Sequence, residues 1–202
     1  MHEILKGTSW SCKSGVERQV GATVPRRTVI AYWLMPSEPA HSCFQQIVNG
    51  LARRYDAPVF EPHVTVHVGA DHADAAKQAI AHAARECTPI TLTPIGIHES
   101  EEFVKTLFVQ FAVNAELRRF NEIIGNAAHD SSQYHLEPHL SLLYKKMETA
   151  TRRELAASIY VPLSEVTFDT IKAVRCLSPT QSRADVEAWR VVAAASLPGD
   201  RV

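Results

Sequence analysis

Hydrophobic and polar residues alternate along this chain with two different periods, one typical of strands and one typical of helices. Residues 28–35 (TVIAYWLM) are β-branched, aromatic or aliphatic and stop at Pro36, which predicts a buried strand. The segment HVTVHV at 63–68 alternates strictly, which predicts a strand with one polar face. Further strands are expected within 90–99, 103–111, 139–144, 166–177 and 186–197.

Apolar side chains at helical spacing predict four helices between these strands, at 40–55, 71–86, 114–129 and 148–160. In the first helix, Phe44, Ile47, Val48 and Leu51 share one face, and in the third the inward residues are Leu117, Phe120, Ile123 and Ile124. Residues 1–26 show neither period. We expect a mobile leader there, dispensable for chemistry, followed by a single two-lobed domain at 27–198.

The order of elements repeats once along the chain. EPHVTV at 61–66 returns as EPHLSL at 137–142, in the same position among the surrounding strands and helices. Internal duplication about a pseudo-two-fold axis is the economical explanation. We therefore predict an α+β fold, bilobal, with two related antiparallel sheets and outer helices around a central cleft.

Composition narrows the classes of function. The chain has 21 basic and 22 acidic residues and a formal net charge of -1, without the basic surplus of a protein that coats nucleic acid. Its four cysteines are scattered without a CxxC pair, so neither a zinc ribbon nor a disulfide framework is indicated. No apolar run approaches a membrane span, and the N-terminus lacks a signal-peptide core. We expect a monomeric, cytoplasmic protein that acts on a small molecule.

The duplicated motif carries the candidate chemistry. Side chains two residues apart on a strand share a face, so His63 lies with Thr65, and His139 lies with Ser141. A fold that faces these strands toward each other places two imidazoles and two hydroxyls in one cleft. One imidazole can accept a proton while the other donates one, and the hydroxyls can donate to phosphate oxygens. The motif predicts acid–base catalysis on a phosphate, without a metal ion or cofactor.

His-x-Thr/Ser-x, present twice, resembles the signature of the two-histidine (2H) phosphoesterase superfamily, and the chain is similar to its cyclic phosphodiesterase family. YWLMP, PHVTV, PHLSLLY and VEAWRVV fall in family order over residues 28–197. The resemblance implies metal-independent hydrolysis of a nucleoside 2′,3′-cyclic phosphate to the 2′-phosphate, or of ADP-ribose 1″,2″-cyclic phosphate to ADP-ribose 1″-phosphate. It also implies His63 and His139 as the catalytic pair, and substrate contacts from Thr65, Ser141, Tyr144 and Trp33.

Three alternatives stay open. A related enzyme could act on RNA ends or as a ligase, although the balanced charge favours a small substrate. A nucleotide-binding module without turnover is a second, although both histidines and both hydroxyls are intact. A zinc site from His63, His67 and the Asp71-His72 pair is a third. Residues 63 and 67 of an extended strand are about 13 Å apart, which is too wide for one metal ion.

Four further residues have ambiguous patterns. Strict alternation groups Leu143 with His139 and Ser141, so Tyr144 reaches the cleft only if it lies at the end of its strand. Lys105 could supply positive charge to the cleft, but we expect it on an edge strand, where a lysine discourages aggregation. We expect His67 and His135 at the rim of the cleft or on the surface.

Overall fold

The computed structural model describes residues 25–128 and 134–199, which form five α-helices, one 3₁₀ helix and eight strands. The expected leader lies outside the described residues except for Pro25 and Arg26. The strands are β1 (Arg27–Pro36), β2 (Val64–Ala70), β3 (Ile90–Leu92), β4 (Pro94–Glu99), β5 (Leu107–Phe111), β6 (His139–Leu143), β7 (Val166–Ser178) and β8 (Arg190–Ser196). The helices are α1 (Ala40–Tyr55), α2 (Ala73–Glu86), η1 (Phe103–Lys105), α3 (Ala115–Ala127), α4 (Thr149–Ser158) and α5 (Arg183–Glu187).

All eight strands belong to one antiparallel sheet in the order β3-β7-β1-β2-β6-β5-β4, with β8 paired to β7. The predicted α+β class with antiparallel strands is confirmed. The structure has one sheet where two separate sheets were expected. Strands β2 and β6 pair through a single residue pair, Val64 opposite Leu140, and this pair joins the two groups of strands. Pairing of these two edges satisfies backbone groups that separate sheets would leave exposed.

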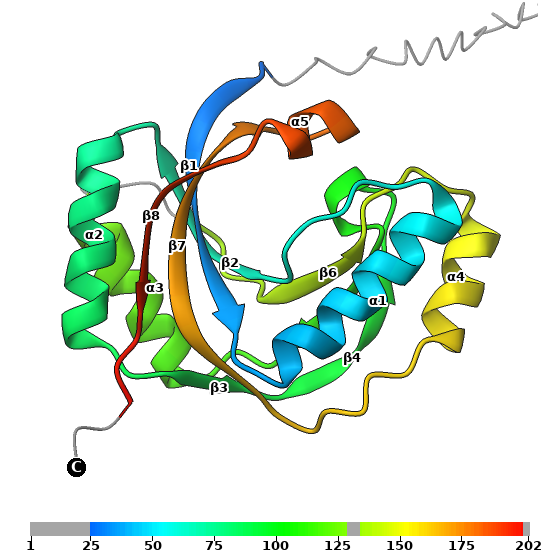
Figure 1. Cartoon of the computed structure of the whole chain (residues 1–202), viewed down its shortest axis with the longest axis horizontal. Coiled ribbons are helices and arrows are strands. Elements are labelled where there is room, and N and C mark those ends of the chain that lie inside the picture. The colour runs from blue at the N-terminus through cyan, green and yellow to red at the C-terminus, as the bar shows by residue number, and fades with distance from the viewer. Residues whose placement is uncertain (1–24, 129–133, 200–202) are drawn as a thin grey trace, which may run out of the picture.

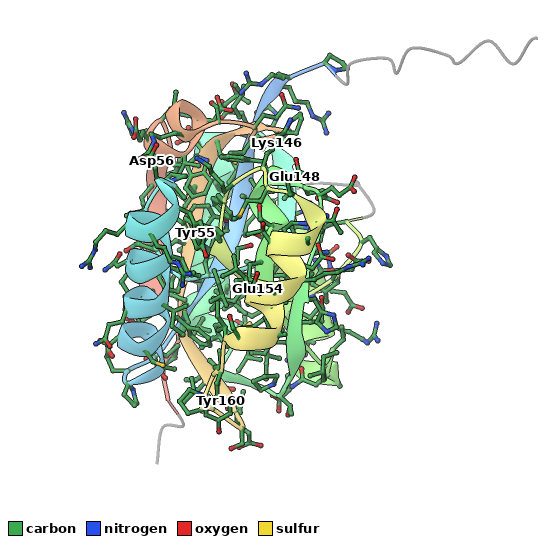
Figure 2. All side chains as sticks on the ribbon, turned by 90° about the vertical axis from the view of Figure 1, so that its right-hand side faces the viewer. Tyr55, Asp56, Lys146, Glu148, Glu154 and Tyr160 are labelled. Carbon is green, nitrogen blue, oxygen red and sulfur yellow. The ribbon has the colours of Figure 1, made fainter. Side chains whose placement is uncertain are left out.

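Two pairs of helices cover the sheet at opposite ends of the molecule (Figure 1). Helices α2 and α3 pack against β2, β7 and β8, whereas α1 and α4 pack against β4, β5 and β6. Figure 2 shows the face formed by α1 and α4, with Asp56 near its upper end and Tyr160 near its lower end. The packing is reciprocal between the two halves of the chain. Helix α1 of the first half covers β6 of the second, and α3 of the second half covers β2 of the first.

The core lies between the sheet and these helices. Three of the four predicted inward residues of α1 are buried, and so are Leu117, Phe120 and Ile124 of α3. Burial of each such side chain contributes about 1.5–3 kcal/mol, so helical periodicity identified the faces that hold the fold together. Among the described helices, none is long and apolar enough to cross a membrane. The thiols of Cys43, Cys87 and Cys176 are free.

Two predicted strands begin later than expected. The segment from Val186 to Trp189 belongs to the end of α5 and the turn after it, because Ser182 accepts a hydrogen bond from the Asp185 amide and starts a helix there. Lys105 lies in η1, before β5 begins at Leu107. The expectation that Lys105 protects an edge strand is therefore wrong.

Candidate active site

The single pair between β2 and β6 brings the two motifs together. Val64 and Leu140 are the residues that directly follow the two histidines, and both are fully buried. Because the strands are antiparallel, this register places His63 on the side of Ser141 and Thr65 on the side of His139. Each histidine thus lies beside the hydroxyl of the other motif.

All six predicted site residues line one cavity of about 250 Å³. They come from four places in the fold, namely β1, β2 with the residue before it, β6, and the residue after β6. The remaining lining residues are Val29, Ala31, Val68, Val104, Cys176, Leu177, Ser178, Pro179, Thr180 and Trp189. The structure therefore gathers the whole predicted set in one place.

The two imidazoles are held in the same way. His63 Nδ1 lies 2.7 Å from the backbone oxygen of Glu61, and His139 Nδ1 lies 2.8 Å from the backbone oxygen of Glu137. A carbonyl oxygen can only accept, so each Nδ1 carries the hydrogen. In the neutral form this fixes the tautomer and leaves the Nε2 lone pair free to accept a proton.

Aromatic rings enclose His63 more tightly than His139. The His63 ring is stacked on Trp33, with centroids 3.8 Å apart, and its side chain is only 7% exposed. Burial lowers the pKa of His63 to about 4, against the opposing effect of the Glu61 carbonyl. His139 is half-buried, with the Phe108 ring steeply inclined to its own and the ring centroids 5.5 Å apart, and burial lowers its pKa as well. Both imidazoles are thus neutral at pH 7 when the cleft is empty.

The two hydroxyls differ in their hydrogen bonds. Ser141 Oγ donates to the backbone oxygen of Val104 at 2.7 Å and is buried. Thr65 is half-buried, and its hydroxyl has no partner among the residues that the structure describes. The Thr65 hydroxyl is free to donate to a ligand, whereas the Ser141 hydroxyl must first turn away from Val104.

Tyr144 reaches the cavity because β6 ends at Leu143, which places the tyrosine just beyond the strict alternation. Its ring stacks on Phe60, with centroids 3.8 Å apart. Burial raises the pKa of the Tyr144 phenol, so the hydroxyl keeps its proton. Tyr144 can therefore serve as a hydrogen-bond donor in the cavity.

His67 is buried on the other side of the sheet, so its expected place at the rim or surface is wrong. A β-bulge in β2 pairs His67 with Tyr32 and Thr65 with Trp33, which turns the two β2 residues to opposite faces. His67 is 2% exposed and packs near Tyr134 and Asn121.

The alternative zinc site is not supported. His63 faces the cavity while His67 faces the core, and Asp71 accepts a hydrogen bond from Arg175 at 2.8 Å. Within residues 25–128 and 134–199, no three histidine, cysteine or acidic side chains gather in a way that could hold a metal ion. His135 is exposed, as expected.

Several cavity residues lay outside the sequence prediction. Trp189 contacts the rings of Trp33, His63 and Tyr144 with its edge or face. It lies in VEAWRVV, where the sequence predicts the start of the last strand, although β8 begins only after it, at Arg190. Phe60 directly precedes the first Glu-Pro-His. Phe60 does not line the cavity itself, but its ring stacks on that of Tyr144, which does.

Comparisons with known proteins identify the family of the chain. The family described as cyclic phosphodiesterase-like protein matches residues 28–197. A cyclic phosphodiesterase of Arabidopsis thaliana is 27% identical over 176 residues, covering 85% of this chain and 97% of that protein.

Solved structures share the fold. LigT of Escherichia coli in its apo form has a TM-score of 0.55 at 15% identity, covering 84% of this chain and 96% of that one. LigT complexed with 3′-AMP has a TM-score of 0.52 at 16% identity, covering 83% and 96%. The chain therefore belongs to the cyclic phosphodiesterase-like family of the two-histidine phosphoesterase superfamily, and it is a cyclic phosphodiesterase.

Proposed function

We propose that this enzyme hydrolyses a cyclic phosphate on a ribose, either a nucleoside 2′,3′-cyclic phosphate or ADP-ribose 1″,2″-cyclic phosphate, without a metal ion. The observation that carries the proposal is the meeting of both His-x-Thr/Ser motifs in one cavity, each imidazole with its Nδ1 hydrogen engaged. A volume of about 250 Å³ is at the small end for ligand sites, which favours a nucleotide over a polymer. The 3′-AMP bound to LigT is a ligand of that size class.

The different environments of the two imidazoles support a division of roles between them. His63 is the more deeply buried, and burial lowers its pKa to about 4, which suits a general base; the half-buried His139 serves as the general acid. A water oxygen attacks phosphorus and gives its proton to His63 Nε2. The bond from phosphorus to the leaving ribose oxygen breaks, and that oxygen takes a proton from His139 Nε2. Exchange with solvent then restores the starting protonation of both rings.

Thr65 and Ser141 hold the non-bridging oxygens, where negative charge increases in the transition state. Tyr144, which remains protonated, donates a further hydrogen bond to the substrate, and Trp33 keeps the His63 ring in place by stacking. The protonated His139 and these donors thereby stabilise the negative charge that a metal ion stabilises in other phosphoesterases.

We expect the profile of kcat/KM against pH to be a bell on the acid side of 6.5. Activity rises as His63 loses its proton near pH 4, and falls as His139 loses its own below the ordinary imidazole value. A bound phosphodiester anion favours both imidazolium ions, so the kcat profile lies at higher pH than the kcat/KM profile. Initial rates between pH 3.5 and 9 measure both profiles.

Circular dichroism at each pH is the control. As pH falls from 6.5 toward 4, the unfolded chain takes up a proton at residue 63 that the folded state does not, so the fold loses stability. Loss of rate without loss of ellipticity is assigned to catalysis. A kcat/KM profile that stays flat from pH 5 to 9 would contradict an acid–base pair of histidines.

A panel of substrates tests the function itself. The four nucleoside 2′,3′-cyclic phosphates, ADP-ribose 1″,2″-cyclic phosphate and an RNA oligonucleotide with a 2′,3′-cyclic end are incubated separately, and products are resolved by chromatography. We expect small cyclic phosphates to be opened to one isomer, the 2′-phosphate from nucleotides, with rates unchanged by EDTA. Preference for the oligonucleotide would indicate an RNA-end enzyme instead, and tight binding without turnover would indicate a binding module. Loss of activity to chelators and recovery with zinc would refute the metal-free mechanism.

A further inference from the structure

The glutamate of each Glu-Pro-His segment is held by a lysine from a distant part of the chain. Lys172 Nζ, on β7, lies 2.9 and 2.7 Å from the two carboxylate oxygens of Glu61. Lys105 Nζ, in η1, lies 3.1 Å from Glu137 Oε2. Both lysine side chains are largely covered, at 19% and 17% exposed. A lysine–glutamate ion pair therefore lies beside each histidine. The lysine comes from a strand in one pair and from a 3₁₀ helix in the other.

Each of these glutamates also orients a histidine through its main chain. The backbone oxygen of Glu61 accepts from His63 Nδ1, and that of Glu137 accepts from His139 Nδ1. The proline between glutamate and histidine fixes one backbone dihedral of the short segment. Holding the carboxylate thus restricts the carbonyl that sets the ring orientation.

Each lysine also lies next to the aromatic ring that packs on the same histidine. Lys172 is paired across β7 and β1 with Trp33, the ring on which His63 stacks. Lys105 Nζ lies 4.9 Å from the centre of the Phe108 ring, which packs against the His139 ring in a T-shaped arrangement.

We propose that Lys172 and Lys105 are positioning residues for the reaction, each anchoring the glutamate whose carbonyl orients a catalytic imidazole. The inference rests on the proposed roles of the two histidines. Neither lysine is among the residues that line the described cavity, which favours action through the glutamates over contact with substrate.

The paired charges also balance each other at the imidazoles. The charged and titratable groups that act on His63 are His139, Glu61 and Lys172. Those that act on His139 are Lys105, Glu137 and Glu102. In both sets the lysine lowers the histidine pKa and the glutamates raise it. Removing one partner of a pair leaves the other uncompensated, so the two removals shift the histidine pKa in opposite directions.

Single substitutions of the lysines test the positioning role. In Lys172→Met and Lys105→Met we expect kcat to fall about 3- to 30-fold with KM within about twofold, because a misaligned proton-transfer group slows chemistry without weakening ground-state binding. Lys172→Arg should keep most of the rate, since an arginine can hold the same carboxylate. The matched control is Lys77→Met, which removes an exposed lysine that pairs with Asp74 on α2. A tenfold rise in KM with unchanged kcat would show that the lysines bind substrate, and would overturn the proposal.

Imidazole nitrogen spectra provide a readout that needs no substrate. Long-range ¹H–¹⁵N correlation of the labelled protein reports the tautomer and the pKa of each histidine. The His63 pKa should rise by about 0.2–0.7 in Lys172→Met and fall by a similar amount in Glu61→Gln, as expected for removal of one nearby charge. Unchanged tautomers, pKa values and kcat in these variants would refute the positioning role. The spectra are recorded on the free protein, so the tautomers and pKa values that they report do not depend on the proposed substrate. The proposed function is tested separately, by the histidine variants and the substrate panel.

Discussion

Replacing His63 or His139 with alanine will lower kcat/KM for a cyclic phosphate by a factor of about 10²–10⁴, the usual contribution of a positioned acid or base. The structure gives the reason for each residue. Both rings line the same cavity, and both have their Nδ1 hydrogen bound to a glutamate carbonyl, so Nε2 is the nitrogen available for proton transfer. Steady-state rates on the best substrate of the panel measure the effect. The double variant should lose far less than the product of the two single losses, because the pair acts as one unit.

A second substitution separates catalysis from folding. His63→Ala leaves a hole beside Trp33, which destabilises the fold independently of chemistry. His63→Asn keeps a side-chain donor for the Glu61 carbonyl but cannot transfer a proton at neutral pH, so it should be as inactive as alanine and better folded. His72→Ala is the matched control, because His72 is exposed at the start of α2. A near-wild-type rate in either histidine variant would end the two-histidine mechanism.

Thr65→Val and Ser141→Ala should each reduce transition-state stabilisation by about 1–3 kcal/mol, or roughly 5- to 150-fold in kcat/KM. We expect the Thr65 substitution to have the larger effect on rate, because its hydroxyl is free to donate. Ser141→Ala should have the larger effect on melting temperature, because it leaves the carbonyl of the half-buried Val104 without its donor. Thr65→Ser restores the hydroxyl and should restore most of the activity. Unchanged kcat/KM in both variants would mean that the hydroxyls only serve the strands.

The candidate site was predictable where local pattern decides side-chain direction. The duplicated motif gave His63, Thr65, His139 and Ser141 from period-two alternation alone, and the cavity contains all four. Strict alternation places His67 on the same face as Thr65, and that prediction is wrong. A bulge between β1 and β2 turns the His67 side chain to the opposite face, and no residue in HVTVHV indicates the bulge.

Other features depend on contacts between distant segments. The ion pair of Lys172 with Glu61 joins residues 111 positions apart, and nothing in the local sequence of either residue points to the other. The joining of β2 to β6 in one sheet rests on a single residue pair and has no sequence signal of its own. The assignment of VEAWRVV to a strand missed the helix start at Ser182, although serine is a favoured residue at that position.

The exchange of helices between the two halves limits how such an enzyme can have arisen. Helix α1 covers a strand of the second half, and α3 covers a strand of the first. An ancestral protein with one copy of the unit would expose the strand that its own helix does not cover, and it would carry one histidine. Two identical copies that traded helices would complete both cores and assemble a site with one histidine from each subunit. In a single chain the two halves can differ in sequence, as the unequal burial of His63 and His139 shows here.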